Sequence, residues 1–197
     1  SLLRAGDHII SSAFLFGNTN SLLGTLQNFG IEVSFVDATD AANIEQAMRP
    51  NTRLVFVETI ANPVTQIADL VPIGELCAKH NVVYCVDNTM TSPHLFSPKS
   101  AGASLIINAL TKYIGGHGNA LGGSVTETGL FDWSRFDNIY ETYRKGDAHS
   151  WGITQIRKKG LRDMGASLGP EAAHHLAVGS ETLPLRMDRA CANAQAL

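Results

Sequence analysis

The chain has 197 residues, which is enough for one domain with a substantial core. Its hydrophobic content of 44% and its charged content of 17% are typical of a globular protein. The net charge of −3 comes without a basic run, so nucleic acid is not expected as a partner. No apolar stretch reaches the roughly 18 residues of a membrane-spanning helix, so no membrane is expected as a partner either.

The three cysteines form no C-x-x-C pair, and an odd number of cysteines without such spacing fits a reducing compartment. Cys85 lies in an apolar run and is expected to be buried as a small hydrophobic residue. Residues 1–7 lack the apolar core of a signal peptide, so the expected location is cytoplasmic. The seven histidines have no zinc-binding spacing, and no metal site is expected.

Strand and helix signals alternate regularly as far as residue 126. Strands are expected at 7–12, 31–36, 54–58, 82–87, 104–108 and 122–126, and helices at 20–29, 41–48 and 72–80. Strands separated by helices of this length predict an α/β fold, with a mostly parallel sheet, right-handed crossovers and helices on both faces.

After residue 131 the pattern changes. Residues 131–149 are aromatic and charged and are expected to be helical in part, and helices are expected at 151–160, 171–180 and 183–197. Aromatic residues of this stretch are dense for a solvated surface: Trp133, Phe136, Tyr140, Tyr143 and Trp151. Either they form a protein–protein contact or they pack under the domain's own helices, and the sequence leaves both alternatives open.

Two of the apolar runs stop at chemically useful residues. One ends on Asp87, and the run at 104–108 is followed by Lys112, just before a glycine-rich turn. Ligands bind beyond the carboxyl ends of parallel strands, so these two side chains are expected to face one site. Pyridoxal 5'-phosphate uses such a pair, because it forms a Schiff base with a lysine and a carboxylate keeps its ring nitrogen protonated. The alternatives are a turn-capping aspartate and a solvated surface lysine.

The segment TKYIGGHG at 111–118, followed by Gly122 and Gly123, resembles the signature around the cofactor lysine of the Cys/Met-metabolism family of pyridoxal-phosphate enzymes. This group includes cystathionine gamma-synthase, acylhomoserine sulfhydrylase and methionine gamma-lyase, and the similarity runs from about residue 6 to residue 186. The resemblance implies the large domain of fold-type I enzymes, with Lys112 as the catalytic residue that binds the cofactor and moves protons.

The resemblance also implies roles for four other residues. Asp87 matches the partner of the cofactor's ring nitrogen, and Phe16 matches a position where many relatives carry a tyrosine stacked on the ring. Asn62 matches an asparagine near the phenolic oxygen, and Thr111 a hydroxyl that touches the phosphate. The alternatives are a core aromatic for Phe16 and a turn asparagine before proline for Asn62.

The sequence departs from the family pattern at three of these positions or beside them. Phe16 lacks the tyrosine hydroxyl, which makes a pure methionine gamma-lyase less expected. Ile60 stands where relatives usually have proline, and Ala109 where they usually have serine, so one expected donor to the phosphate is missing.

The activity implied is γ-replacement on an activated homoserine ester, a small amino-acid substrate, to form a sulfur amino acid. The alternatives are γ- or β-elimination by a lyase, and an inactive fragment that keeps the fold. Family members are roughly twice this length, so a fragment is expected. Residues 1–180 would form the cofactor-binding large domain, incomplete at its N-terminus, and 181–197 the start of a helix leading to a C-terminal domain. The family also implies a homo-oligomer, a dimer of dimers, in which a neighbouring subunit completes the phosphate site.

Overall fold

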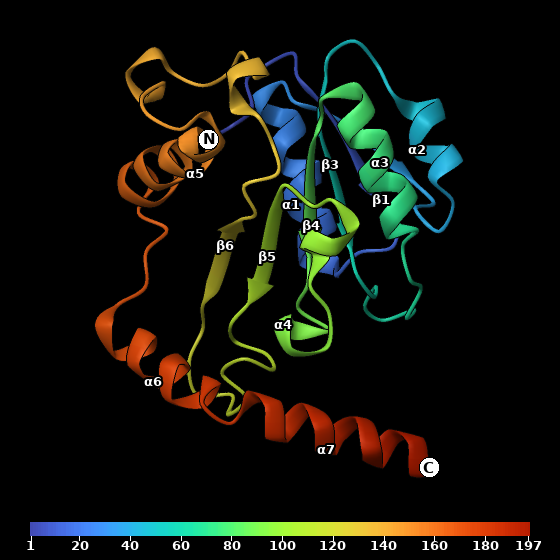
Figure 1. The fold of residues 1–197 in the computed structure, drawn as a ribbon, viewed down its shortest axis with the longest axis vertical. Coiled ribbons are helices and arrows are strands. Elements are labelled where there is room, and N and C mark those ends of the chain that lie inside the picture. The colour runs from blue at the N-terminus through green and yellow to red at the C-terminus, as the bar shows by residue number, and fades with distance from the viewer.

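A six-stranded sheet forms the centre of the protein in the computed structural model, which describes residues 1–197 (Figure 1). Its strands are β1 (His8–Ser12), β2 (Glu32–Val36), β3 (Thr52–Glu58), β4 (Val83–Asp87), β5 (Leu105–Ala109) and β6 (Gly123–Glu127). They lie in the order β2-β1-β3-β4-β5-β6, with β1 to β5 parallel and β6 antiparallel to β5. The expected mostly parallel α/β fold is confirmed.

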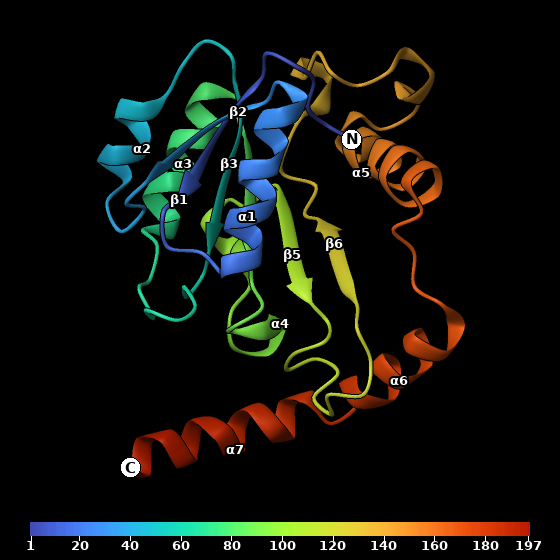
Figure 2. The ribbon, with the colours of Figure 1, turned by 180° about the vertical axis from the view of Figure 1, so that it is seen from behind.

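Helices cover both faces of the sheet, with α1 on one face and α2 and α3 on the other (Figures 1 and 2). The helices are α1 (Gly17–Leu26), α2 (Ala41–Ala47), α3 (Leu70–His80), α4 (Ser92–Leu95), α5 (Trp151–Gln155), α6 (Pro170–Ser180) and α7 (Leu183–Ala196). A π-helical segment, Ile156–Asp163, continues α5. None of these helices has the length and apolar character needed to cross a membrane.

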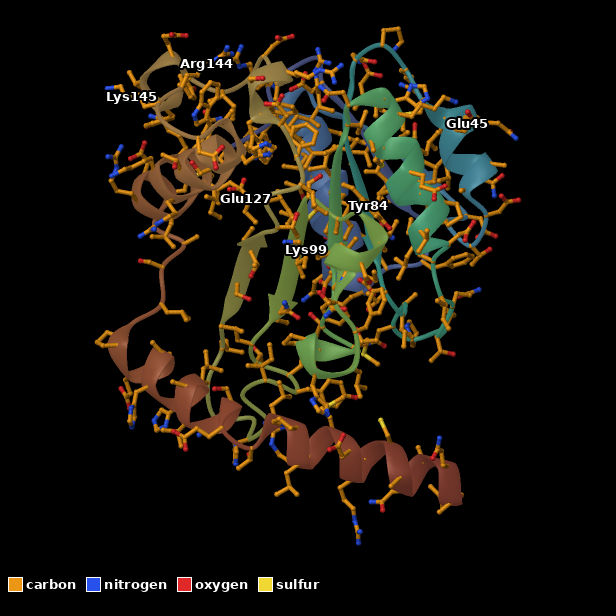
Figure 3. The ribbon with its side chains drawn as sticks, in the orientation of Figure 1. Glu45, Tyr84, Lys99, Glu127, Arg144 and Lys145 are labelled. Atoms are coloured by element: carbon orange, nitrogen blue, oxygen red, sulfur yellow. The ribbon has the colours of Figure 1, made fainter.

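The core consists of two apolar clusters, one on each face of the sheet. Val83 and Cys85 of β4 belong to the cluster under α1, and Tyr84 and Val86 to the cluster under α2 and α3. Successive side chains of a strand point to opposite faces, so a strand buried on both faces is apolar throughout. The Tyr84 hydroxyl donates to the Leu70 carbonyl (3.2 Å), which ties the strand to α3 (Figure 3).

Local signals mark the ends of two helices, although α1 begins at Gly17 and ends at Leu26 where residues 20–29 were expected. The Asp40 carboxylate accepts from the Ala42 amide (2.8 Å) and caps α2. Gly30 has φ +76° and ends the turn that follows α1. On α3, Leu76 faces the core and Ala78 is exposed.

Residues 131–149 form short 3₁₀ turns, Trp133–Arg135, Glu141–Tyr143 and Ala148–Ser150, and no longer helix. Trp133 and Phe136 are buried and pack edge-to-face with Phe131, at ring distances of 4.7 and 6.1 Å from it. Packing within the domain is therefore the right alternative for these two residues. Tyr140, in contrast, is 50% exposed.

The C-terminal helices occupy two different places around the sheet. A Glu127 carboxylate oxygen, at the end of β6, accepts from the Ile153 amide of α5 (3.2 Å) (Figure 3). Helices α6 and α7 lie along the carboxyl ends of the parallel strands, below the arrowhead of β5 in both views (Figures 1 and 2). These two helices therefore partly cover the carboxyl ends of the parallel strands.

A substitution at Gly74 tests how closely α3 packs against the chain at Ala101. A Cβ there would overlap the carbonyl oxygen of Ala101, so Gly74→Ala is expected to lower the free energy of unfolding by about 1–3 kcal/mol. The matched control is Gly24→Ala on α1, where a Cβ meets nothing within 4 Å. Alanine favours a helix, so this variant should gain about 0.5–1 kcal/mol. Urea denaturation measures both, and equal stability of the two variants would contradict the packing described.

Candidate active site

A cavity of about 640 Å³ lies at the carboxyl ends of the parallel strands. Its walls come from the ends of β1, β3, β4 and β5, and from α7. All five site residues expected from the sequence line it: Phe16, Asn62, Asp87, Thr111 and Lys112. The structure therefore brings together, in one cavity, residues that are up to 96 positions apart (112 − 16).

Strand order explains why the cavity forms here. The chain passes from β1 to β2 on one side of the sheet and then returns to β3 on the other side of β1. The loops that follow β1 and β3 diverge at this reversal, and open α/β sheets bind ligands in the crevice that results. Phe16 follows β1 and Asn62 follows β3, so both loops border the crevice.

Glu58, the last residue of β3, links these two loops. It is not among the site residues expected from the sequence. One carboxylate oxygen accepts from the Phe16 amide (2.7 Å) and the other from the Asn62 amide (3.3 Å). Burial raises the pKa of Glu58, the two amides oppose that rise, and the nearby charge of Asp87 adds to it. The sequence does contain a signal for Glu58 as a site residue, because the apolar run of β3 ends on Glu58 just as that of β4 ends on Asp87.

Asp87 is held by Thr89, two residues further along. Its Oδ1 accepts from the Thr89 amide (2.9 Å) and hydroxyl (2.5 Å), and that hydroxyl accepts from the Ala109 amide of β5 (2.8 Å). Burial raises the pKa of Asp87, and the hydrogen bonds from Thr89 oppose the rise. Asp87 does not cap the helix that begins at Ser92, but its bond from the Thr89 amide is that of a turn-capping aspartate. Its Oδ2 has no hydrogen-bond partner in the protein.

Lys112 lies in a tight turn directly after β5. Its carbonyl accepts from the Gly116 amide (2.7 Å), and Gly116 has φ +72°, a conformation that favours glycine. Lys112 is exposed, and its amine makes no ion pair. The neighbouring Thr111 hydroxyl accepts from the Gly122 amide (2.9 Å) and donates to the Gly122 carbonyl (3.3 Å), which closes the loop.

Phe16 and Asn62 present free groups to the cavity. Phe16 is 42% exposed, so it is not a core aromatic. The Asn62 side chain is also exposed and makes no hydrogen bond within the protein, although the residue does precede Pro63 in a turn. Ile60, where relatives usually have proline, lines the same cavity.

These groups fit the ring end of pyridoxal phosphate. They offer an amine without an ion pair, a carboxylate oxygen without a partner, an exposed aromatic face and a free amide. They fit the phosphate end less well, since Ala109 has no hydroxyl and the Thr111 hydroxyl is already bonded to Gly122. The donors for the ring are thus more complete than those for the phosphate.

Comparisons with known proteins identify the relatives of this chain. The sequence model of the family described as Cys/Met metabolism PLP-dependent enzyme matches residues 1–197. The O-acetyl-L-homoserine sulfhydrylase of Leptospira meyeri is 35% identical, over 98% of this chain and 48% of the relative. The L-methionine gamma-lyase of Treponema denticola is 36% identical, over 99% of this chain and 44% of the relative. The chain therefore spans about half the length of the curated relatives it matches.

Solved structures share the fold. That of an O-acetylhomoserine sulfhydrylase from Wolinella succinogenes superposes with a TM-score of 0.86 and 36% identity, over 99% of this chain and 55% of that one. A structure from Campylobacter jejuni, solved with pyridoxyl-lysine monophosphate, gives a TM-score of 0.84 and 34% identity, over 93% and 49% of the two chains. The sheet and its helices are those of fold-type I enzymes.

Thr89→Val tests the link between Asp87 and Ala109. Valine removes the hydroxyl bond to the carboxylate and leaves the Ala109 amide without its partner, at an expected cost of about 1–3 kcal/mol. The lost hydroxyl bond also raises the pKa of Asp87 further. The difference from the unsubstituted protein should thus be largest above that pKa and should shrink as the pH falls through it.

The measurement is urea denaturation between neutral and acidic pH. Thr89→Ser keeps the hydroxyl and should behave like the unsubstituted protein. A Thr89→Val deficit that does not depend on pH would mean that the hydroxyl supports Ala109 alone.

Proposed function

The chain belongs to the Cys/Met metabolism family of PLP-dependent enzymes, and on that premise we propose that the protein catalyses γ-replacement on an activated homoserine ester. The observation that supports this most is a single cavity that gathers Lys112, Asp87 and Phe16 from three different strand ends. The sulfhydrylase relatives point to an acylhomoserine as substrate and to sulfide or a thiol as the second reactant.

Each residue of the cavity has a role in this proposal. Lys112 would hold the cofactor through its amine and would take and return protons at the substrate carbons. Asp87 Oδ2 would keep the ring nitrogen protonated, Phe16 would cover the ring, and the Asn62 amide would donate to the phenolic oxygen. Thr111 lies beside the phosphate. Bound pyridoxal phosphate supplies the electron sink for removal of the α-proton.

In γ-replacement the Cγ–O bond of the ester breaks, the acyl group leaves as a carboxylate, and a new Cγ–S bond forms. The second candidate is γ-elimination, which breaks a Cγ–S bond, releases a thiol and, with addition of one water molecule, ends in a 2-oxo acid and ammonia. The methionine gamma-lyase relatives support it at similar identity. Phe16 weighs against it, because the residue has no phenolic hydroxyl to act as an acid or base there.

The proposal extends to organisation and assembly. Residues 1–180 would be the cofactor-binding large domain and residues 181–197 a helix leading towards a C-terminal domain. A homo-oligomer, as a dimer of dimers, is supported by the incomplete phosphate donors and by the exposure of Tyr140 and Leu185. A cytoplasmic location is supported by three free cysteines, Cys77, Cys85 and Cys191.

The full-length protein, loaded with pyridoxal phosphate, should form homocysteine from O-acetylhomoserine and sulfide. Lys112→Ala should abolish both this product and covalent attachment of the cofactor, measured by mass spectrometry after borohydride reduction. Lys99→Ala, which changes an exposed lysine outside the cavity, is the control and should leave both intact (Figure 3).

Three outcomes would contradict this proposal. Attachment at a different lysine would remove Lys112 from its role. Attachment without any product would favour the inactive fragment. A 2-oxo acid formed from methionine, with no homocysteine from the ester, would favour the lyase.

Asp87→Asn should leave the cofactor attached but slow turnover. A neutral amide cannot hold the ring nitrogen protonated, and losing ~3 kcal/mol of stabilisation in the transition state slows the step roughly 100-fold. Steady-state kinetics measures the effect, with Asp137→Asn, an exposed carboxylate remote from the cavity, as the control. A near-normal rate with bound cofactor would exclude Asp87 as the ring partner.

A further inference from the structure

Arg186, in the first turn of α7, links three separate segments of the chain. Its Nη1 donates to the Tyr113 carbonyl (2.6 Å), and its Nη2 donates to the carbonyls of Ile114 (3.1 Å) and Gly179 (2.8 Å). Its Nε donates to the Thr182 hydroxyl (3.0 Å). The guanidinium group therefore joins the turn that follows Lys112 to the end of α6 and the start of α7.

The acceptors on the lysine side are the two carbonyls directly after Lys112. The turn also approaches Arg186 and α6 so closely that two glycines are required. A Cβ on Gly116 would overlap the guanidinium group, and a Cβ on Gly179 would overlap the Gly115 carbonyl. The turn and the two helices are thus fitted to one another as well as hydrogen-bonded.

Arg186 lines the cavity, which raises the question of whether it binds a ligand or positions the turn. A guanidinium group has five N–H donors, and here four of them bond to the protein. A ligand-binding arginine keeps a pair of donors free for a carboxylate or phosphate, because that recognition is bidentate. A single free N–H does not supply this.

We propose that Arg186 is a positioning residue, which holds the turn at 112–116 against α6 and α7 and thereby sets where the Lys112 amine lies in the cavity. This inference rests on the proposed function in so far as Lys112 binds the cofactor. Its mechanical part, the hold on the turn, stands without the cofactor.

Hydrogen exchange tests the mechanical part. The amides of Gly115 and Gly116 bond to Leu110 and Lys112 within the turn, so their exchange rates report its opening. In the full-length protein without cofactor, Arg186→Ala should speed this exchange about tenfold or more, since three carbonyls lose a charged donor. Arg186→Lys should give an intermediate effect, because an ammonium group has the charge but not the spread of donors.

Arg189→Ala is the matched control. Arg189 lies on the same helix, is exposed and makes no side-chain hydrogen bond within the protein, so exchange of the turn should not change. If Arg186→Ala does not fold, Arg186→Lys provides the comparison. Exchange in the Arg186 variants equal to that of the Arg189 control would overturn the proposal.

The rate of covalent attachment of pyridoxal phosphate to Lys112 tests the positioning part. It should fall several-fold in Arg186→Ala and remain unchanged in Arg189→Ala. Faster exchange with an unchanged attachment rate would overturn positioning and leave a structural contact only. Full rescue of both measurements by Arg186→Lys would support the hold on the turn and would show that one charged donor is enough for it. If the unsubstituted protein does not attach cofactor at Lys112, the proposed function fails, and the exchange result still decides whether Arg186 holds the turn.

Discussion

Two carboxylates stand side by side in the cavity because β3 and β4 pair in parallel with Glu58 opposite Asp87. Burial raises the pKa of both groups, and hydrogen bonds to the carboxylates oppose that rise. The two carboxylates accept these hydrogen bonds in different ways. Glu58 accepts one backbone amide on each oxygen, whereas Asp87 uses only Oδ1 and leaves Oδ2 free. This difference supports a structural role for Glu58 and a ligand-binding role for Asp87.

The same parallel register explains what the sequence could predict. Strands buried on both faces are continuous apolar runs. The pattern of apolar residues in the sequence therefore locates the carboxyl ends of the strands, and with them Asp87 and Lys112. Glu58 obeys the same rule and could have been included. Arg186 could not, because only the path of α6 and α7 brings it to a turn 72 residues earlier (186 − 114).

The aromatic stretch around Trp133 was ambiguous because aromatic content does not distinguish a core from a contact surface.

Hydroxyl groups at the carboxyl edge hold loops together as well as facing the cavity. Thr89 connects Asp87 to Ala109, and Thr111 connects its own turn to Gly122. Without a hydroxyl at Ala109, few side-chain donors remain for a phosphate. A phosphate here would need donors beyond these side chains, which supports the proposed homo-oligomer.

The first turn of α7 is hydrogen-bonded to the turn that follows Lys112. Arg186 bonds to carbonyls in the turn after Lys112 and at the end of α6. The sheet beneath is held by two apolar clusters that do not include this turn. A displacement of α7 would thus move the lysine turn while Asp87, fixed on β4, stays in place. The distance between the Lys112 amine and the Asp87 carboxylate then depends on where α7 lies, and this is how the positioning role proposed for Arg186 would act on the cavity.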